Sequence, residues 1–469
     1  MNCDKANGAS QLGLRTFGAR WLLVLTLALM GSDWTARGAQ QSSSPDAGVL
    51  SVQGATGTSP ASSPAEPATK TTPDAYRLPH DRYEKAVALA RRENVLYFVS
   101  TGWGILVLIL LLWIGVVAKL RDLAERASSN RFVQSLLFTP GLLLLLALLH
   151  LPLAIYGHQL TLRYELSIQG WDSWLRDWCK RELLVVAVGF LLVWILFAVI
   201  RWKPRAWWLY FWFAVVPIAL FIFFISPWLI DPMFNTFRPL QEKQAALVDA
   251  IGELTRHAGV PISVNRMFLM EASTKTNEIN AYVTGFGSSK RVVIWDTTIQ
   301  KASPDEVLYI VGHELGHYVL GHIWKGFMFF VVGAFFGLYA AFCLLRWLLG
   351  KWGSVWGIRG QEDWAALAVL LLIMNVLDFV ATPIGNGFSR MQEHQADVYG
   401  LEVTHGLIPH SGEVAAGAFQ VLGDIDLADP KPSKFITFWL YSHPPLGERL
   451  VFAHSYDPWS KGEAPQFVK

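Results

Sequence analysis

The sequence predicts an α-helical polytopic membrane protein, a helical bundle joined to one soluble domain that is split in the chain. Its 469 residues are 52% hydrophobic and only 16% charged, whereas a typical soluble chain carries about 25% charged residues. The mean hydropathy is +0.32. Six apolar runs are each about long enough to cross a bilayer, and they lie at about 96–118, 133–157, 183–200, 206–230, 325–349 and 364–385.

Residues 1–38 are similar to a signal peptide. A basic stretch ending at Arg20 precedes an apolar core, and Asp33 ends that core after 12 intervening residues. Since a membrane span needs about 20 residues, we interpret this core as a signal-peptide core, the alternative being an uncleaved short anchor. Residues 39–74 are rich in Ser, Pro, Thr, Ala and Gly, and this composition predicts a disordered linker.

The remaining chain divides into two predicted regions. Residues 75–230 form an N-terminal membrane region with four transmembrane helices. Residues 231–469 contain two further transmembrane helices, at about 325–349 and 364–385, between the polar segments of the soluble domain.

The distribution of basic residues predicts the orientation in the membrane. The loops after the first, third and fifth runs all lie on one side, and they carry Lys119, Arg121, Arg126, Arg131, Arg201, Lys203, Arg205, Lys351 and Arg359. The opposite loop, 158–182, carries four basic residues, so the difference in charge is moderate. Because basic loops stay in the cytoplasm, we expect a multi-pass protein of the plasma (inner) membrane with its soluble domain outside the cytoplasm.

Charge and cysteine content exclude other classes of protein. The chain has 39 basic and 37 acidic residues, a net charge of +2, which is too balanced for a nucleic-acid-binding protein. Its three cysteines, Cys3, Cys179 and Cys343, are scattered, which excludes a disulfide framework. We therefore expect the lipid bilayer, and no nucleic acid, as a partner.

The segment 312–317, GHELGH, contains the pattern H-E-x-x-H. On a helix, residues four apart lie about 40° apart around the axis, so His313 and His317 can bind one metal ion. Glu314 lies beside them, where it can take a proton from a metal-bound water. Residues 303–306, SPDE, predict the start of this helix, because an early Pro and acidic residues favour a helix N-terminus. The pattern predicts one Zn²⁺ per chain.

A further histidine, His322, follows His317 by five residues. If the helix continued, His322 would be turned away by about 140°. We therefore reject His322 as a ligand and expect it to face solvent or lipid headgroups.

Glu393 is the predicted third zinc ligand. The fifth and sixth runs form a hairpin that turns near Trp356, and the arms from His317 to Trp356 and from Trp356 to Glu393 are nearly equal in length. Glu393 should therefore return to the depth of His317. His394 is the competing ligand, disfavoured because no Asp lies four residues after it. Asp397 lies one turn after Glu393, where it can accept an N–H from a ligand imidazole.

Several motifs together resemble the CAAX prenyl protease 1 family, integral-membrane zinc metalloendopeptidases of the gluzincin type. The resemblance covers about residues 75–460. Its strongest parts are 312–322 (GHELGHYVLGH), 389–397 (SRMQEHQAD) and 441–450 (YSHPPLGERL), and 279–297 is also similar. The family's fold is a ring of transmembrane helices around a hydrated chamber, with a small α+β zinc-metalloprotease domain closing one end.

The resemblance also implies the roles of the site residues. It implies that the zinc ligands are His313, His317 and Glu393, and that Glu314 is the general base. It further implies that Asp397 orients a ligand. Finally, it implies that His443 and Arg449 lie at the active site and help to bind the substrate or the developing oxyanion.

A predicted strand pair lies beside this site. Residues 279–284 and 291–296 flank a turn at 285–289. An edge strand can hold an extended peptide through main-chain hydrogen bonds, and we assign Asn280, Ala281 and Tyr282 to this role. The alternative is a purely structural hairpin.

The predicted function is hydrolysis of peptide bonds through a zinc-activated water. The resemblance implies C-terminal processing of prenylated CAAX proteins, so the substrate is a peptide or protein, prenylated or membrane-associated. Two features depart from the family, namely the signal-like segment that replaces its first span and an orientation opposite to that of its eukaryotic members. A quality-control protease facing out of the cytoplasm is therefore the first alternative, and a non-catalytic membrane protein is the second.

Overall fold

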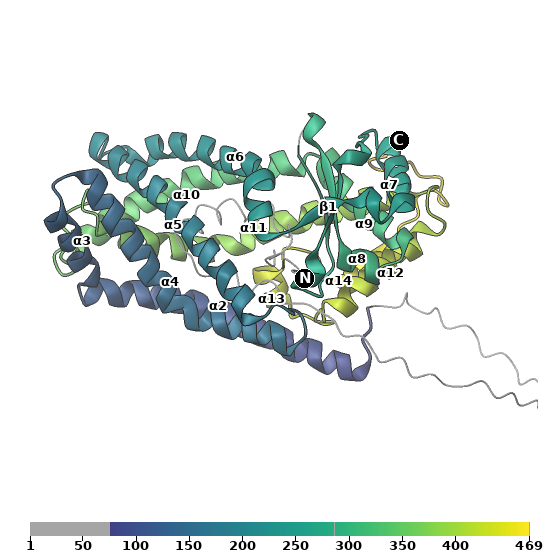
Figure 1. Ribbon diagram of the computed structural model, residues 1–469, viewed down its shortest axis with the longest axis horizontal. Coiled ribbons are helices and arrows are strands. Elements are labelled where there is room, and N and C mark those ends of the chain that lie inside the picture. Colours follow the sequence, from purple (N-terminus) through teal and green to yellow (C-terminus); the bar gives the residue numbers. More distant parts are fainter. Residues whose placement is uncertain (1–75, 286, 469) are drawn as a thin grey trace, which may run out of the picture.

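The computed structural model describes residues 76–468 except residue 286 (Figure 1). The predicted signal-peptide-like segment 1–38 and linker 39–74 lie outside the described residues. The molecule is elongated, with long helices towards one end and a small sheet with shorter helices towards the other (Figure 1).

Within the described residues, six helices are long and apolar enough to cross a membrane, in agreement with the six predicted runs. They are α2 (His80–Trp113), α4 (Arg131–Arg163), α5 (Trp171–Trp202), α6 (Trp207–Phe234), α10 (His322–Trp352) and α11 (Ala366–Thr404). Several of them extend well beyond the apolar runs. In particular, α11 continues to Thr404, so its polar second half enters the soluble part of the molecule.

The first predicted run, 96–118, is broken in the structure. Helix α2 ends at Trp113, and α3 (Val116–Ala127) begins after Gly115. The backbone of Gly115 has φ +71°, a left-handed conformation that glycine adopts readily and that redirects the chain.

The three basic loops lie together at the end of the bundle marked by α3. Arg121 of α3 forms a buried ion pair with Asp363, and Gln361 Nε2 donates to the Pro204 carbonyl at 2.8 Å. A cluster of buried apolar side chains, with Trp364 fully buried in it, fills this end. The structure thus confirms that these loops share one end, while the side of the membrane stays a prediction.

A four-stranded sheet lies at the other end (Figure 1), with the order β1-β2-β4-β3. Its strands are β1 (Phe237–Pro239), β2 (Met267–Met270), β3 (Ala281–Thr284) and β4 (Arg291–Trp295). β2 and β4 are parallel, whereas the β1–β2 and β3–β4 pairs are antiparallel. The predicted pairing of 279–284 with 291–296 is therefore confirmed, and β3 is an edge strand.

The turn between β3 and β4 requires glycine at its first position. Gly285 has φ +92°, and a Cβ atom there would lie 2.3 Å from the carbonyl oxygen of Ser289. Both the backbone conformation and the close approach exclude a side chain. This turn sets the antiparallel register that pairs Ala281 with Ile294.

Both polar segments of the chain contribute to the unit around the sheet. Its other helices are α7 (Ala245–His257), α8 (Asp296–Lys301), α9 (Pro304–Val319), α12 (Ser411–Ile425), α13 (Lys434–Leu440) and α14 (Leu446–Ser455). The ring of Tyr309 on α9 lies 5.6 Å from that of Phe419 on α12, in an edge-to-face contact. Segments separated by α10 and α11 thus share a core.

Candidate active site

Helix α9 carries the H-E-x-x-H pattern and begins where the sequence predicted. Ser303 Oγ accepts a hydrogen bond from the Glu306 N–H at 3.3 Å, and Glu306 Oε2 accepts from the Ser303 N–H at 2.7 Å. This capping box satisfies two backbone donors, and Pro304 needs none. The first turn of α9 is therefore well defined.

Helices α9 and α11 approach each other closely because glycines face the contact. A Cβ atom on Gly316 would lie 3.0 Å from Tyr399 Cβ and 3.2 Å from Ala396 Cα. A Cβ atom on Gly400 would lie 3.2 Å from His313 Cα. Without side chains at these positions, the backbones can pack closely enough to bring α11 against the histidines of α9.

Three side chains from these two helices converge. His313 Nε2 lies 3.2 Å from His317 Nε2 and 3.3 Å from Glu393 Oε2, and His317 Nε2 lies 3.6 Å from Glu393 Oε1. A tetrahedral site with metal–ligand bonds of about 2.1 Å has donor atoms about 3.4 Å apart. Two imidazoles and one carboxylate at these spacings fit a zinc ion and leave its fourth position open.

His394, the competing ligand, does not join this group. Its side chain is exposed, and its ring lies 4.7 Å from that of Phe452. Consecutive residues of a helix point about 100° apart, so only one of Glu393 and His394 can face α9. The structure brings Glu393 to the histidines.

The two imidazoles differ in their electrostatic surroundings. Burial would lower the pKa of His313, but hydrogen bonding to the carboxylates of Asp397 and Glu393 outweighs it and raises the pKa to about 10. For His317, burial is the dominant influence and lowers the pKa to about 3. The two carboxylates therefore favour the charged form of His313, whereas burial favours the neutral form of His317.

Asp397 and Arg449 lie behind His313. His313 Nδ1 lies 2.9 Å from Asp397 Oδ1, as expected for a residue that orients a ligand. Arg449 of α14 donates to both oxygens of Asp397, at 2.9 Å from Nε and 2.5 Å from Nη2, and its guanidinium stacks over Phe419. The Arg449 side chain is thus directed at Asp397, and its contact with the site is indirect.

His443 reaches the site from the segment between α13 and α14. Its Nε2 lies 3.2 Å from Glu393 Oε2, and its Nδ1 lies 2.9 Å from Ser442 Oγ. Helix α13, which precedes this segment, is held by α11, because Asn386 Nδ2 donates to the Trp439 carbonyl at 2.6 Å and Arg390 Nη1 to the Thr437 carbonyl at 2.9 Å. Arg390 Nη1 also donates to the Tyr441 carbonyl, within the segment itself. His443 is thus brought next to Glu393.

The remaining predicted residues lie on α9 and β3. Glu314 is half-buried on α9, next to His313 in the helix. Both main-chain groups of Asn280 are turned towards neighbouring segments, since its N–H donates to Thr298 Oγ1 at 2.8 Å and its carbonyl accepts from the Trp295 N–H at 3.0 Å. Because main-chain groups alternate along a strand, those of Ala281 point to the side of β3 that has no neighbouring strand, whereas those of Tyr282 face β4. Ala281 is itself buried.

The expectation that His322 faces solvent or headgroups is wrong. His322 is fully buried, its Nδ1 lies 3.1 Å from His317 Nδ1, and its Nε2 lies 3.0 Å from Gln395 Oε1. The prediction assumed a continuous helix, but α9 ends at Val319 and Gly321, with φ +67°, redirects the chain. The glycine directly before His322 is the signal in the sequence that indicates this turn.

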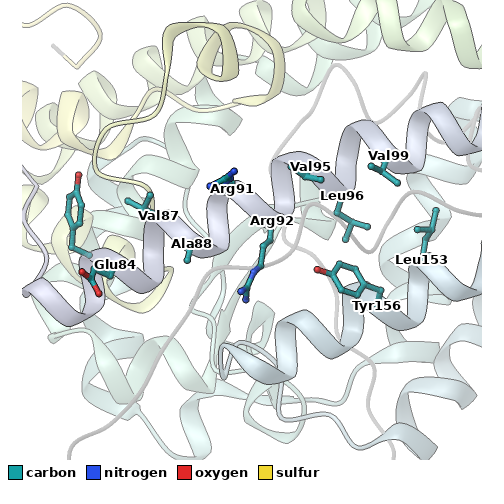
Figure 2. A pocket seen from close by; sticks show the side chains of 11 residues that line it. Glu84, Val87, Ala88, Arg91, Arg92, Val95, Leu96, Val99, Leu153 and Tyr156 are labelled. Carbon is teal, nitrogen blue, oxygen red and sulfur yellow. The ribbon is translucent and has the colours of Figure 1, made fainter.

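A separate pocket of about 630 Å³ lies between α2 and α4 (Figure 2). Its lining runs along α2 from Tyr83 to Val99 and includes Leu153 and Tyr156 of α4. Arg91 and Arg92 lie midway along this lining. No lining residue of this pocket comes from α9 or α11, so among the described residues it is distinct from the histidine–glutamate site.

Comparison with known proteins identifies the family. Residues 241–456 match peptidase family M48, and residues 67–236 match the N-terminal domain of CAAX prenyl proteases, described as five membrane helices. An uncharacterized metalloprotease of Bacillus subtilis, YhfN, is 36% identical over 361 residues, which are 77% of this chain and 83% of that protein. The chain belongs to peptidase family M48. As an M48 protein with apolar helices long enough to span a bilayer, it is a membrane metalloendopeptidase.

Other relatives bear the name that the motifs suggested. The CAAX prenyl protease 1 homolog of Oryza sativa is 26% identical and covers 80% of this chain and 85% of its own length. The CAAX prenyl protease 1 of Saccharomyces cerevisiae is also 26% identical, over 68% of this chain and 71% of its own length. The crystal structure of S. mikatae Ste24p has a TM-score of 0.67 at 22% identity and covers 80% of this chain and 88% of that one. The predicted family and fold class are thus confirmed.

Proposed function

We propose that this M48 protein is a zinc metalloendopeptidase whose metal ion is held by His313, His317 and Glu393. The convergence of two Nε2 atoms and one carboxylate, at spacings of 3.2 to 3.6 Å, is the observation that supports this proposal. When bound, the zinc ion would polarise the carbonyl of the scissile peptide bond and lower the pKa of a water molecule.

The chain's own residues would then perform the proton transfers. Glu314 would act as the general base, taking a proton from the attacking water and later giving it to the leaving amine. Asp397, held by Arg449, would keep His313 in the orientation that directs Nε2 at the metal ion. His443, next to Glu393, would donate a hydrogen bond to the oxyanion that develops on the scissile carbonyl.

The edge strand β3 would hold the substrate. An extended peptide can add to a sheet edge by main-chain hydrogen bonds, and the outward groups of Ala281 are suited to this. Asn280 and Tyr282 flank Ala281. The main-chain groups of Asn280 are already bonded, so Asn280 can contact a peptide only through its side chain. We therefore assign the main-chain contact to Ala281 and a side-chain contact to Asn280.

We also propose how the regions are arranged. Residues 75–230 would form the N-terminal membrane region, and residues 231–469 the metallopeptidase domain, which closes one end of a hydrated chamber between the helices. The site residue His317 lies near the start of α10, whereas the basic loop 353–365 follows the other end of this 31-residue helix. The separation of the site from the basic loops supports an extracytoplasmic site in the plasma membrane.

The names of the relatives suggest a prenylated CAAX substrate, and a peptide pair tests it. The purified protein would be given a farnesylated CAAX-type peptide and the same peptide without the lipid, with Glu314→Gln as the blank and mass spectrometry of the products. Cleavage that requires the lipid supports CAAX processing. Cleavage of both peptides, absent from the blank, would favour a quality-control protease that acts on membrane-associated proteins. Equal product in the blank would contradict the role of Glu314.

A further inference from the structure

The two histidines of the site have different partners behind their rings. His313 Nδ1 faces the carboxylate of Asp397 at 2.9 Å, and Arg449 balances that charge. His317 Nδ1 faces a third imidazole, that of His322, at 3.1 Å. Thus a charged acceptor lies behind one histidine, whereas an imidazole lies behind the other.

Two residues of helix α11, one on each side of Glu393 in the sequence, hold His322 in place. Gln395 Oε1 lies 3.0 Å from His322 Nε2, and the buried Gln392 amide donates to the His322 main-chain carbonyl at 3.4 Å. His322 is fully buried at the first position of α10. The helix that supplies Glu393 therefore also fixes the position and rotation of the His322 ring.

The hydrogen bonds from His317 through His322 to Gln395 can run in only one direction if His317 binds a metal ion. A neutral imidazole that offers Nε2 to a metal ion carries its proton on Nδ1. That N–H must be accepted by His322 Nδ1, which is then unprotonated, so His322 carries its own proton on Nε2. The His322 Nε2–H in turn donates to Gln395 Oε1, the acceptor found there.

We propose that His322 is a positioning residue for the metal site, a neutral imidazole that accepts the Nδ1–H of His317 and is itself oriented by Gln395. This proposal rests on the zinc site of His313, His317 and Glu393 proposed above. His322 is not a fourth ligand, because it contacts Nδ1 of His317, whereas Nε2 is the atom that faces Glu393. Its effect is to fix the tautomer and ring orientation of His317 without adding a second buried negative charge.

The test measures zinc affinity. Parent and variants would be purified in detergent, stripped with a chelator and titrated with zinc against a chromophoric competitor. His322→Phe keeps a ring but removes both nitrogens, whereas His322→Asn retains an acceptor close to the position of Nδ1. His394→Phe is the matched control, because His394 is adjacent to Glu393 but exposed.

Loss of a partner behind a metal-binding histidine typically lowers metal affinity about 10- to 100-fold. We expect that loss for His322→Phe, affinity within about threefold of the parent for His322→Asn, and no change for His394→Phe. Gln395→Met, which removes the acceptor of His322 and leaves its ring in place, should weaken zinc binding by an intermediate factor. If His322→Phe does not fold, Gln395→Met still tests the role of His322 by the same zinc titration.

The outcomes separate this proposal from the proposed function. A parent that binds one zinc ion, together with His322→Phe and Gln395→Met variants that bind it equally well, would overturn the role of His322 alone. A parent that binds no zinc would overturn the zinc site and this proposal together. Weaker binding in both variants with rescue by His322→Asn would support the proposal.

Discussion

Arg449 and Asp397, 52 positions apart in the chain, form a buried two-point ion pair directly behind His313. The same Asp397 oxygen that accepts from Arg449 Nη2 lies 2.9 Å from His313 Nδ1. One carboxylate therefore links α9, α11 and α14. Because Arg449 compensates its charge, Asp397 can support His313 without being an unpaired buried anion.

The first prediction is that Arg449→Met destabilises the protein, by about 3–5 kcal/mol, because it removes one partner of a buried, two-point ion pair. The thermal unfolding midpoint in detergent and the zinc affinity should both fall. Arg176→Met is the control, since Arg176 contacts Asp172 at 3.2 Å with both side chains exposed, and an exposed pair contributes at most about 1 kcal/mol. Equal losses in the two variants would contradict the prediction.

Glu314→Gln should retain zinc and lose turnover. The amide has nearly the same size as the carboxylate but cannot accept the proton of the attacking water, so we expect turnover to fall by at least about 100-fold. Zinc content by elemental analysis and peptide cleavage by mass spectrometry give the two readouts. Parent-like turnover in a zinc-loaded variant would rule out Glu314 as the general base.

Gly316→Ala should disturb the contact between α9 and α11. The added methyl would lie 3.0 Å from Tyr399 Cβ and 3.2 Å from Ala396 Cα, and such overpacking typically costs about 1–3 kcal/mol. Gly337→Ala on α10 is the matched control, because a Cβ there has nothing within 4 Å, and the alanine should be neutral or stabilising by up to about 1 kcal/mol. The comparison uses thermal midpoints in the same detergent, and an unchanged Gly316→Ala midpoint would count against the close contact.

Ala281→Pro tests the edge strand as a substrate platform. Proline removes the outward N–H of Ala281 and leaves the bonds of β3 to β4 intact, since those come from the alternate residues. We expect kcat/KM for a peptide to fall at least about tenfold, the effect of one lost main-chain hydrogen bond to the substrate. Ala281→Ser, which keeps the N–H, should cleave like the parent. If both variants cleave equally, the platform lies elsewhere.

Labelling of Cys179 tests the orientation. Cys179 is exposed on α5. It lies close to Asp177 of the same helix, which forms an ion pair with Lys275 of the sheet region at 2.7 Å. A membrane-impermeant maleimide should therefore label it in intact cells of a Cys3→Ser background, and Cys179→Ser provides the blank. Labelling only after permeabilisation would place the site in the cytoplasm and reverse the predicted orientation.

Much of the site could be predicted from local sequence, because its residues are spaced by about one turn of a helix. The i, i+4 spacing brings His313 and His317 to one face of any helix, and Ser303 with Glu306 marks where that helix begins. Glu393 could be matched to them because two arms of equal length in a hairpin return to the same depth. Asp397 followed from Glu393 by one turn of helix.

Other relationships depended on long-range packing. His322 was misplaced because a single left-handed residue, Gly321, ends one helix and starts another, which reverses the direction of the side chain that follows. The pairing of Arg449 with Asp397 has no local periodicity, because the two residues lie on separate helices, α14 and α11, which only the tertiary fold brings into contact. The outward direction of Ala281 depends on which residues of β3 bond to β4.

By itself, the sequence determined the membrane-spanning helices, the metal-binding pattern and the family motifs, because hydrophobic length and helical spacing act within a single segment. Only the tertiary structure decided which groups stand behind His313 and His317. Those contacts join residues from α9, α10, α11 and α14, and their geometry arises from close packing of helix backbones at Gly316 and Gly400. Such packing is a property of several segments together, which no single segment encodes.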